Sequence, residues 1–116
     1  MELKDLNGII DIDIDGSLAR FGDMIEFYVK FLKKFSEDKN FEDLKIALDR
    51  SDVKKIEEIA HTLKGVAGNL GLNKVYQYSN EIVNLARENK LEEINNIRPE
   101  LEKEMQHVTE ILKKLI

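Results

Sequence analysis

The chain has 116 residues, of which 42% are apolar and 35% charged, so residues 1–116 fit a single globular domain with one core. The absence of cysteine excludes disulfides, thiolate zinc sites and cysteine nucleophiles. The 18 basic and 23 acidic residues leave a net charge of −5, which disfavours nucleic acid and anionic membranes as partners.

The N-terminal part of the chain differs in pattern from the rest. The run DIDIDG at residues 11–16 alternates between acidic and apolar residues with period two, and the following residues, SLARFG, end in a glycine. We expect residues 1–22 to form a short segment or helix that lies across one end of the remaining domain.

Helices are predicted for most of the remaining chain. One proline and six glycines leave few residues for the many turns of an all-β domain, whereas leucine, isoleucine, glutamate and lysine recur at helical spacing. The first long helix covers about residues 23–36, and its expected inner face consists of Phe21, Met24, Ile25, Tyr28, Leu32 and Phe35. A shorter helix follows from Phe41 to near Ser51, and Ser51 or Asp52 can cap the next one.

The C-terminal half of the chain predicts three further helical segments. One carries an apolar stripe made of Val53, Ile56, Ala60, Leu63, Ala67 and Leu70, and it stops at Gly71. Asn73 is the expected cap of a helix over about residues 74–89, whose inward residues are Val75, Tyr76, Ile82, Val83 and Ala86. The pattern resumes over residues 91–115, where we expect Pro99 to kink or restart the helix.

Four main amphipathic helices joined by short turns can hide their apolar stripes by packing side by side in alternating directions. The sequence therefore predicts an all-α fold, an antiparallel up-down four-helix bundle with an additional short N-terminal segment or helix.

His61 is the candidate reactive residue, because it points away from the apolar stripe of its own helix. At about 100° per residue it lies roughly 150° from the centre of that stripe, so it faces water. Lys64, Gly65 and Gly68 follow at i+3, i+4 and i+7 on the same outer face. A glycine inside a helix costs about 1 kcal/mol relative to alanine. On an outer face, core crowding does not explain two of them, whereas clearance for an approaching partner does.

Lys64 can balance the charge of an anion that arrives at this exposed imidazole, so the arrangement suits a docking site for phosphoryl chemistry. The alternative is that His61 is one more solvated residue and that the glycines only announce the helix end at Gly71.

Residues 60–72, AHTLKGVAGNLGL, resemble the signature of the histidine phosphotransfer (HPt) domain. That signature runs His, two residues, Lys-Gly, a small residue three positions further on, and Gly three beyond that. The matching residues are His61, Lys64, Gly65, Gly68 and Gly71. In addition, GSLARFGD at residues 16–23 is similar to the segment that precedes the first long helix in this family.

The resemblance implies that His61 accepts a phosphoryl group and passes it on. The donor would be the aspartyl phosphate of a response-regulator receiver domain, or a hybrid sensor histidine kinase, and the acceptor another receiver. Lys64 would neutralise charge during transfer. The catalytic acids and the Mg²⁺ can sit on the receiver, so the chain would be a phosphocarrier with no cofactor, metal or ATP site of its own.

The resemblance also suggests which residues meet the partner and the phosphoryl group. Those that would meet the partner are Gly65, Gly68, Gly71 and Phe21. Many relatives place on the following helix a glutamine that bonds the imidazole or the phosphoryl group, and an ungapped count from His61 puts Val83 there. Asn80 and Asn84 lie near enough in helical position to replace it, and the sequence does not choose between them.

Other candidate sites are weaker. Asp11, Asp13, Asp15 and Gly16 match the start of a calcium-binding EF-hand loop, but its twelfth position, where a glutamate should close the shell, is Gly22. We interpret this run as a solvated acidic segment. His107 lies off its helix's apolar stripe without a second histidine or a carboxylate cluster, which indicates a surface residue.

A different class of function also fits a small helical domain, namely a non-catalytic helical protein-interaction module or scaffold. In either case we expect a monomer. No uninterrupted apolar run exceeds three residues, far short of a membrane span or a signal-peptide core, so we expect a cytoplasmic protein.

Overall fold

The computed structural model describes all residues 1–116, and its regular elements are all helical. The elements are a 3₁₀ turn η1 (Leu3–Leu6) and the α-helices α1 (Ile14–Arg20), α2 (Ile25–Phe35), α3 (Asn40–Asp49), α4 (Val53–Leu70), α5 (Asn73–Arg87) and α6 (Leu91–Leu112). Extended structure is limited to isolated bridges between Asn7 and Ile10 and between Ile12 and Leu72. The prediction of an all-helical fold is confirmed. None of the helices combines the length and the apolar character that crossing a membrane requires.

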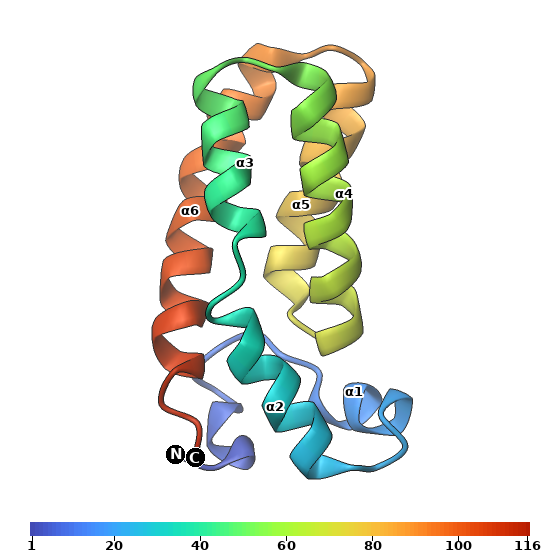
Figure 1. The fold of residues 1–116 in the computed structure, drawn as a ribbon, viewed down its shortest axis with the longest axis vertical. Helices are drawn as coiled ribbons and strands as arrows, with labels where there is room; N and C mark the ends of the chain where they lie inside the picture. Colours follow the sequence, from blue (N-terminus) through green and yellow to red (C-terminus); the bar gives the residue numbers. More distant parts are fainter.

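The helices pack lengthwise into an elongated bundle that measures 40 × 24 × 22 Å (Figure 1). The most extensive contact between helices is that of α4 with α5. The contacts of α5 with α6 and of α3 with α4 are the next largest. Figure 1 shows α2 and α3 following one another up one side, α4 descending beside α3, α5 ascending and α6 descending. The first side of the bundle is therefore shared by two successive helices.

The core consists of 25 buried apolar residues drawn from all of the helices and from both ends of the chain. On α2 the predicted inner face is only partly correct. Tyr28, Leu32 and Phe35 are buried, but Met24 and Ile25 are 52% and 55% exposed. The beginning of α2 lies beyond the ends of α4 and α5 in Figure 1, so neither of these helices covers its first turn.

The caps of the helices agree with the sequence at two positions and differ at one. Asp52 caps α4 by accepting a hydrogen bond from the amide of Lys55, and Gly71 ends α4 with a φ of 77°. Asn73 does not cap α5. It is the first helical residue after Leu72, and its side chain donates to Asp11 instead, because the N-terminal segment lies against this turn.

Pro99 does not restart a helix, because α6 continues through it from Leu91 to Leu112. A proline inside a helix costs a hydrogen bond and crowds the preceding turn. Ile94 and Leu101, buried on either side of it, anchor the helix in the core. Tertiary packing thus outweighs the local preference, as it does for most helices in proteins.

The C-terminal end of α4 is held by residues from earlier in the chain. The last carbonyls of an isolated helix have no partner within it. Here the carbonyl of Leu70 accepts from the hydroxyl of Tyr28, and that of Gly71 accepts from the amide of Asp13. The Arg20 guanidinium donates to the carbonyls of Gly68 and Asn69. The helix that carries His61 is therefore fixed at this end by α1, α2 and the segment before α1.

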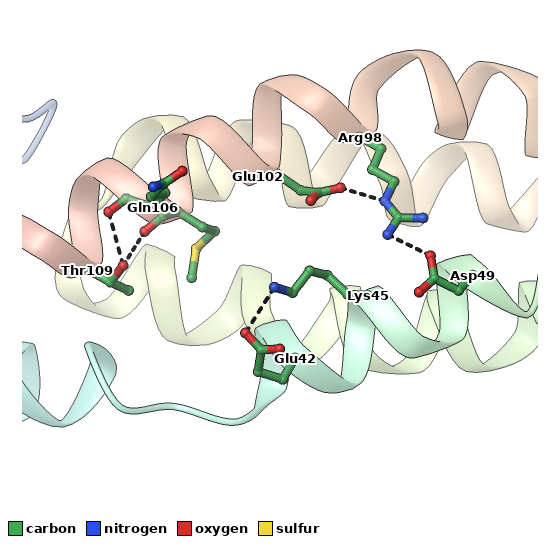
Figure 2. Close-up of polar contacts among 8 residues, drawn as sticks. Glu42, Lys45, Asp49, Arg98, Glu102, Gln106 and Thr109 are labelled. Atoms are coloured by element: carbon green, nitrogen blue, oxygen red, sulfur yellow. Dashed lines mark hydrogen bonds and ion pairs between the residues drawn. The ribbon is translucent and has the colours of Figure 1, made fainter.

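A polar network joins α3 to α6 on the side of the bundle away from α5 (Figure 2). Arg98 of α6 lies between Glu102, one turn further along α6, and Asp49 at the end of α3, 2.8 Å away. These contacts link the two helices through the one guanidinium.

Candidate functional site

His61 lies in the middle of α4 with its side chain in solvent, as the helical wheel predicts. Neither nitrogen of its ring makes a hydrogen bond or an ion pair with another residue of the chain. In contrast, the other histidine, His107, has its Nε2 atom 2.9 Å from the backbone carbonyl of Ile9. His61 is therefore the histidine whose ring nitrogens are free to react with a partner.

On one side of His61, the surface of α4 is covered by a tyrosine from α5. Lys64 Nζ lies 5.8 Å from the centre of the Tyr76 ring, within the range of a cation–π contact. A Cβ atom at Gly68 would lie 3.1 Å from Cδ2 and 3.3 Å from Cε2 of the same ring. The expectation that both glycines face open space is therefore wrong for Gly68, because the side chain of Tyr76 occupies that space.

Tyr76 itself departs from the sequence expectation. The helical pattern predicts an inward side chain, but it is 40% exposed. Its place between α5 and the outer face of α4 could not be found from the sequence of either helix alone, because it depends on how the two helices pack.

On the other side of His61, the surface is open. A Cβ atom at Gly65 would meet nothing within 4 Å. A groove begins beside this glycine and runs between α4 and α2. Its lining residues are Phe31, Lys34, Phe35, Asp38, Gly65, Val66, Asn69 and Leu70. Clearance for a partner therefore fits Gly65, where no side chain of the chain itself fills the space.

Gly71 is buried and lies at the turn after α4, where it caps the helix. Its positive φ of 77° favours glycine, and a Cβ atom would collide with Ser17 Oγ and the Asp13 carbonyl. The glycine is needed so that the segment before α1 can approach the end of α4.

Phe21 belongs to a cluster of aromatic rings on the α2 side of the groove. It is half-buried, and its ring centre lies 5.4 Å from that of Tyr28 and 5.6 Å from that of Phe31. Phe31 and Phe27 have their ring centres 6.0 Å apart and are 39% and 46% exposed. The apolar pattern of the sequence did not single out these two exposed phenylalanines as a candidate surface. Their signal was an i, i+4 aromatic pair lying off the buried stripe of α2.

The two asparagines on α5 have different surroundings. Tyr76 contacts Lys64 and Arg87 pairs with Glu57 at 3.9 Å, so the part of α5 between these residues runs alongside His61. Within that part, Val83 is fully buried and offers no polar group. Asn80 is half-buried one turn after Tyr76. Asn84 is exposed and lines a groove shared with Ile97 of α6.

The acidic run at residues 11–16 makes hydrogen bonds that support the fold. Asp13 accepts a hydrogen bond from the Gly16 amide and so caps α1, while Asp11 accepts from the side chain of Asn73. No group of three or more histidine or acidic side chains is arranged to hold a metal ion.

Comparison of the chain with curated proteins and with solved structures gives no significant match. Among protein families, the Hpt domain matches residues 28–111, which is more than half of the chain. The matched range includes the whole of α4 and begins after α1, so Asp13 and Arg20, which hold the end of α4, lie outside it, whereas Tyr28 lies inside it. On this match, together with an exposed histidine in the expected motif, the chain belongs to the Hpt domain family.

Proposed function

We propose that this chain is a phosphorelay intermediate that carries a phosphoryl group on His61. Hpt domains are phosphocarriers of two-component signalling and work with receiver-domain or kinase partners. The single observation that carries the assignment to this residue is the exposure of the His61 ring, with both nitrogens unengaged, inside the family's motif on α4.

The reaction requires only a free ring nitrogen on this chain. The lone pair of the unprotonated nitrogen forms the N–P bond as the bond between phosphorus and the partner's aspartyl oxygen breaks, and the carboxylate leaves with the electron pair. The ring carries the resulting positive charge until its other nitrogen loses a proton to water. Transfer to the next receiver reverses these steps. Positioning and charge neutralisation dominate such transfers, and the partner's acidic groups and Mg²⁺ supply most of both.

Two neighbours of His61 would support the phosphoryl group. Lys64, at i+3, shares the outer face of α4 and brings a positive charge to the site. Asn80 is the better candidate for the hydrogen bond that Val83 cannot make, because it is the asparagine nearer to Tyr76 and Lys64. Asn84 faces the α5–α6 groove instead.

The partner would approach over α2 and the open side of α4. The groove beside Gly65, together with the exposed rings of Phe27 and Phe31, gives an apolar surface next to His61. Contiguous exposed apolar surface of this kind marks interaction sites. A receiver domain or a hybrid sensor histidine kinase would dock there. The chain itself would act as a cytoplasmic monomer folded as an up-down four-helix bundle.

The test is incubation of the chain with a phosphorylated receiver, followed by detection of acid-labile, alkali-stable phosphate. Native chain should acquire this phosphate and His61→Gln should not, while both keep the same helicity and melting temperature because the side chain is exposed. His107→Gln is the matched control and should acquire phosphate as the native chain does.

The alternative function is a helical interaction module in which only the apolar surface matters, and the exposed phenylalanines favour it. That function is indicated if the native chain binds receivers but neither it nor the His107→Gln variant ever acquires phosphate.

A further inference from the structure

Tyr76 connects two residues of the proposed site that the sequence motif treats as independent. Its ring, which comes from α5, lies against the backbone of α4 at Gly68 and beneath the ammonium of Lys64. Tyr76 is 40% exposed, so it is not a core side chain. Its ring covers the outer surface of α4 at Gly68.

Gly68 makes this arrangement possible. A Cβ atom there would approach the ring to 3.1 Å, closer than side chains normally pack, so even alanine would push the ring outward. Because residue 68 has no side chain, the ring can reach the position at which Lys64, one turn earlier on α4, extends over it.

Lys64 has no carboxylate partner in the structure, and the aromatic face is the contact recorded for its ammonium. A lysine side chain has four rotatable bonds, so holding its charge in one place costs conformational entropy. A cation–π contact lowers that cost before the phosphoryl group arrives. His61 lies three residues before Lys64 on the same face of the helix, so the ring keeps the charge on the side where transfer occurs.

We propose that Tyr76 is a positioning residue for phosphoryl transfer: its ring, seated against Gly68, holds the Lys64 ammonium beside His61. This inference rests on the proposed function of His61. Tyr76 does not touch the reacting atoms and acts only through Lys64.

The experiment is a double-mutant cycle with a conservative rescue. Tyr76→Leu and Tyr76→Phe are made in the native chain and in Lys64→Ala, and the rate of phosphate uptake from a phosphorylated receiver is measured. Since an exposed cation–π contact is worth little, Tyr76→Leu should slow uptake about two- to fivefold in the native chain. It should have no effect in Lys64→Ala, and Tyr76→Phe should keep the native rate because it keeps the ring.

A structural readout separates positioning from simple packing. In the free chain, the ring current of Tyr76 should shift the NMR signals of the Lys64 ε-methylene protons upfield. That shift should persist in Tyr76→Phe and disappear in Tyr76→Leu, with melting temperatures close to native. If Tyr76→Leu does not fold, Tyr76→Met, an unbranched helix former, takes its place.

The outcomes are distinguishable. Absence of phosphate on the native chain overturns the proposed function, and with it the role of Tyr76 in transfer. If the upfield shift of the Lys64 ε-methylene protons persists in Tyr76→Leu, the ring does not position Lys64, whether or not phosphate is acquired. An equal rate loss in the presence and absence of Lys64 also overturns it, because the tyrosine then acts through another residue.

Discussion

The hydroxyl of Tyr28 donates a 2.6 Å hydrogen bond to the backbone carbonyl of Leu70, the last residue of α4. Tyr28 is fully buried in α2, and this bond spans 42 positions of the sequence. Together with the contacts from Arg20 and Asp13, it fixes the end of the helix that carries His61. Residues outside the reactive motif therefore determine how rigidly that motif is held.

Removing the Tyr28 hydroxyl should destabilise the fold. Tyr28→Phe keeps the ring but leaves the carbonyl of Leu70 without its buried partner, which costs about 1–3 kcal/mol. Urea unfolding followed by circular dichroism measures the change. Tyr78→Phe, at a half-buried tyrosine of α5, is the control and should change the free energy of unfolding by less than about 0.5 kcal/mol. Equal stabilities for the two variants would contradict a structural role for the Tyr28–Leu70 bond.

The same residue predicts a loss of stability in alkaline solution. Burial raises the pKa of the Tyr28 hydroxyl above its ordinary value of 10.0, although the nearby Ser17 hydroxyl and the charge of Arg20 act to lower it. Because the folded state holds this proton more tightly than the unfolded state, its contribution is complete below pH 10 and is lost as pH rises through the folded pKa. The free energy of unfolding should therefore fall more steeply above pH 10 in the native chain than in Tyr28→Phe. Parallel pH profiles would show that Tyr28 does not titrate in this way.

Gly71 should tolerate no side chain. Gly71→Ala places a Cβ atom at a positive φ and against Ser17 Oγ and the Asp13 carbonyl, so we expect a loss of more than about 2 kcal/mol. Gly8 is the matched control, because its φ is 85° but nothing lies within 4 Å of the added atom. Gly8→Ala should cost only the backbone strain, roughly 1–2 kcal/mol. Thermal melting of both variants tests the difference, and equal losses would show that the collision at Gly71 relaxes freely.

The sequence could predict the features of this chain that depend on local periodicity. The spacing of apolar residues along α4 and α5 placed both helices within two residues of their observed bounds, and the same periodicity placed His61 in solvent. The resemblance of residues 60–72 then identified the family, which the match over residues 28–111 confirms.

The features that the sequence could not predict depend on contacts between distant segments. The ring of Tyr76 against Gly68 follows from how α5 lies on α4, and the approach of Asp13 to Gly71 follows from the path of the N-terminal segment. Helical wheels describe one helix at a time. They therefore assigned Tyr76 to the core and Gly68 to open space, and both assignments are wrong.

Arg98 should contribute to stability through its two carboxylate partners, Asp49 and Glu102 (Figure 2). Its side chain is only 23% exposed, so the pairs are less screened than surface ion pairs usually are. Arg98→Ala should cost about 1 kcal/mol, and the loss should shrink in 1 M salt, where screening is strong. Arg87, which is 55% exposed and 3.9 Å from Glu57, is the control. Arg87→Ala should lower the free energy of unfolding by less than about 0.5 kcal/mol. Equal losses for the two arginines would show that the α3–α6 network adds nothing beyond an ordinary surface pair.

The two glycines that follow His61 should respond differently to the same substitution. Alanine is the better helix former by about 1 kcal/mol, and the space beside Gly65 is empty, so Gly65→Ala should raise the free energy of unfolding by about that amount. At Gly68 the same gain is opposed by the contact with Tyr76, whose exposed ring can shift outward. Gly68→Ala should therefore gain clearly less than Gly65→Ala. A larger or equal gain at Gly68 would show that the ring moves without cost.

A longer side chain should separate stability from function at Gly65. Gly65→Gln adds a good helix former that points into solvent beside the groove lined by Phe31 and Val66, so the melting temperature should stay at or above the native value. The same side chain would occupy the space over which a receiver approaches His61, so phosphate uptake should slow much more than in Gly65→Ala. The test is to measure the melting temperature and the rate of phosphate uptake for Gly65→Ala and Gly65→Gln. A packing defect would lower the stability and the rate together. If Gly65→Gln keeps the native stability and the native rate, partners do not approach over this side of α4, and the clearance explanation of Gly65 is wrong.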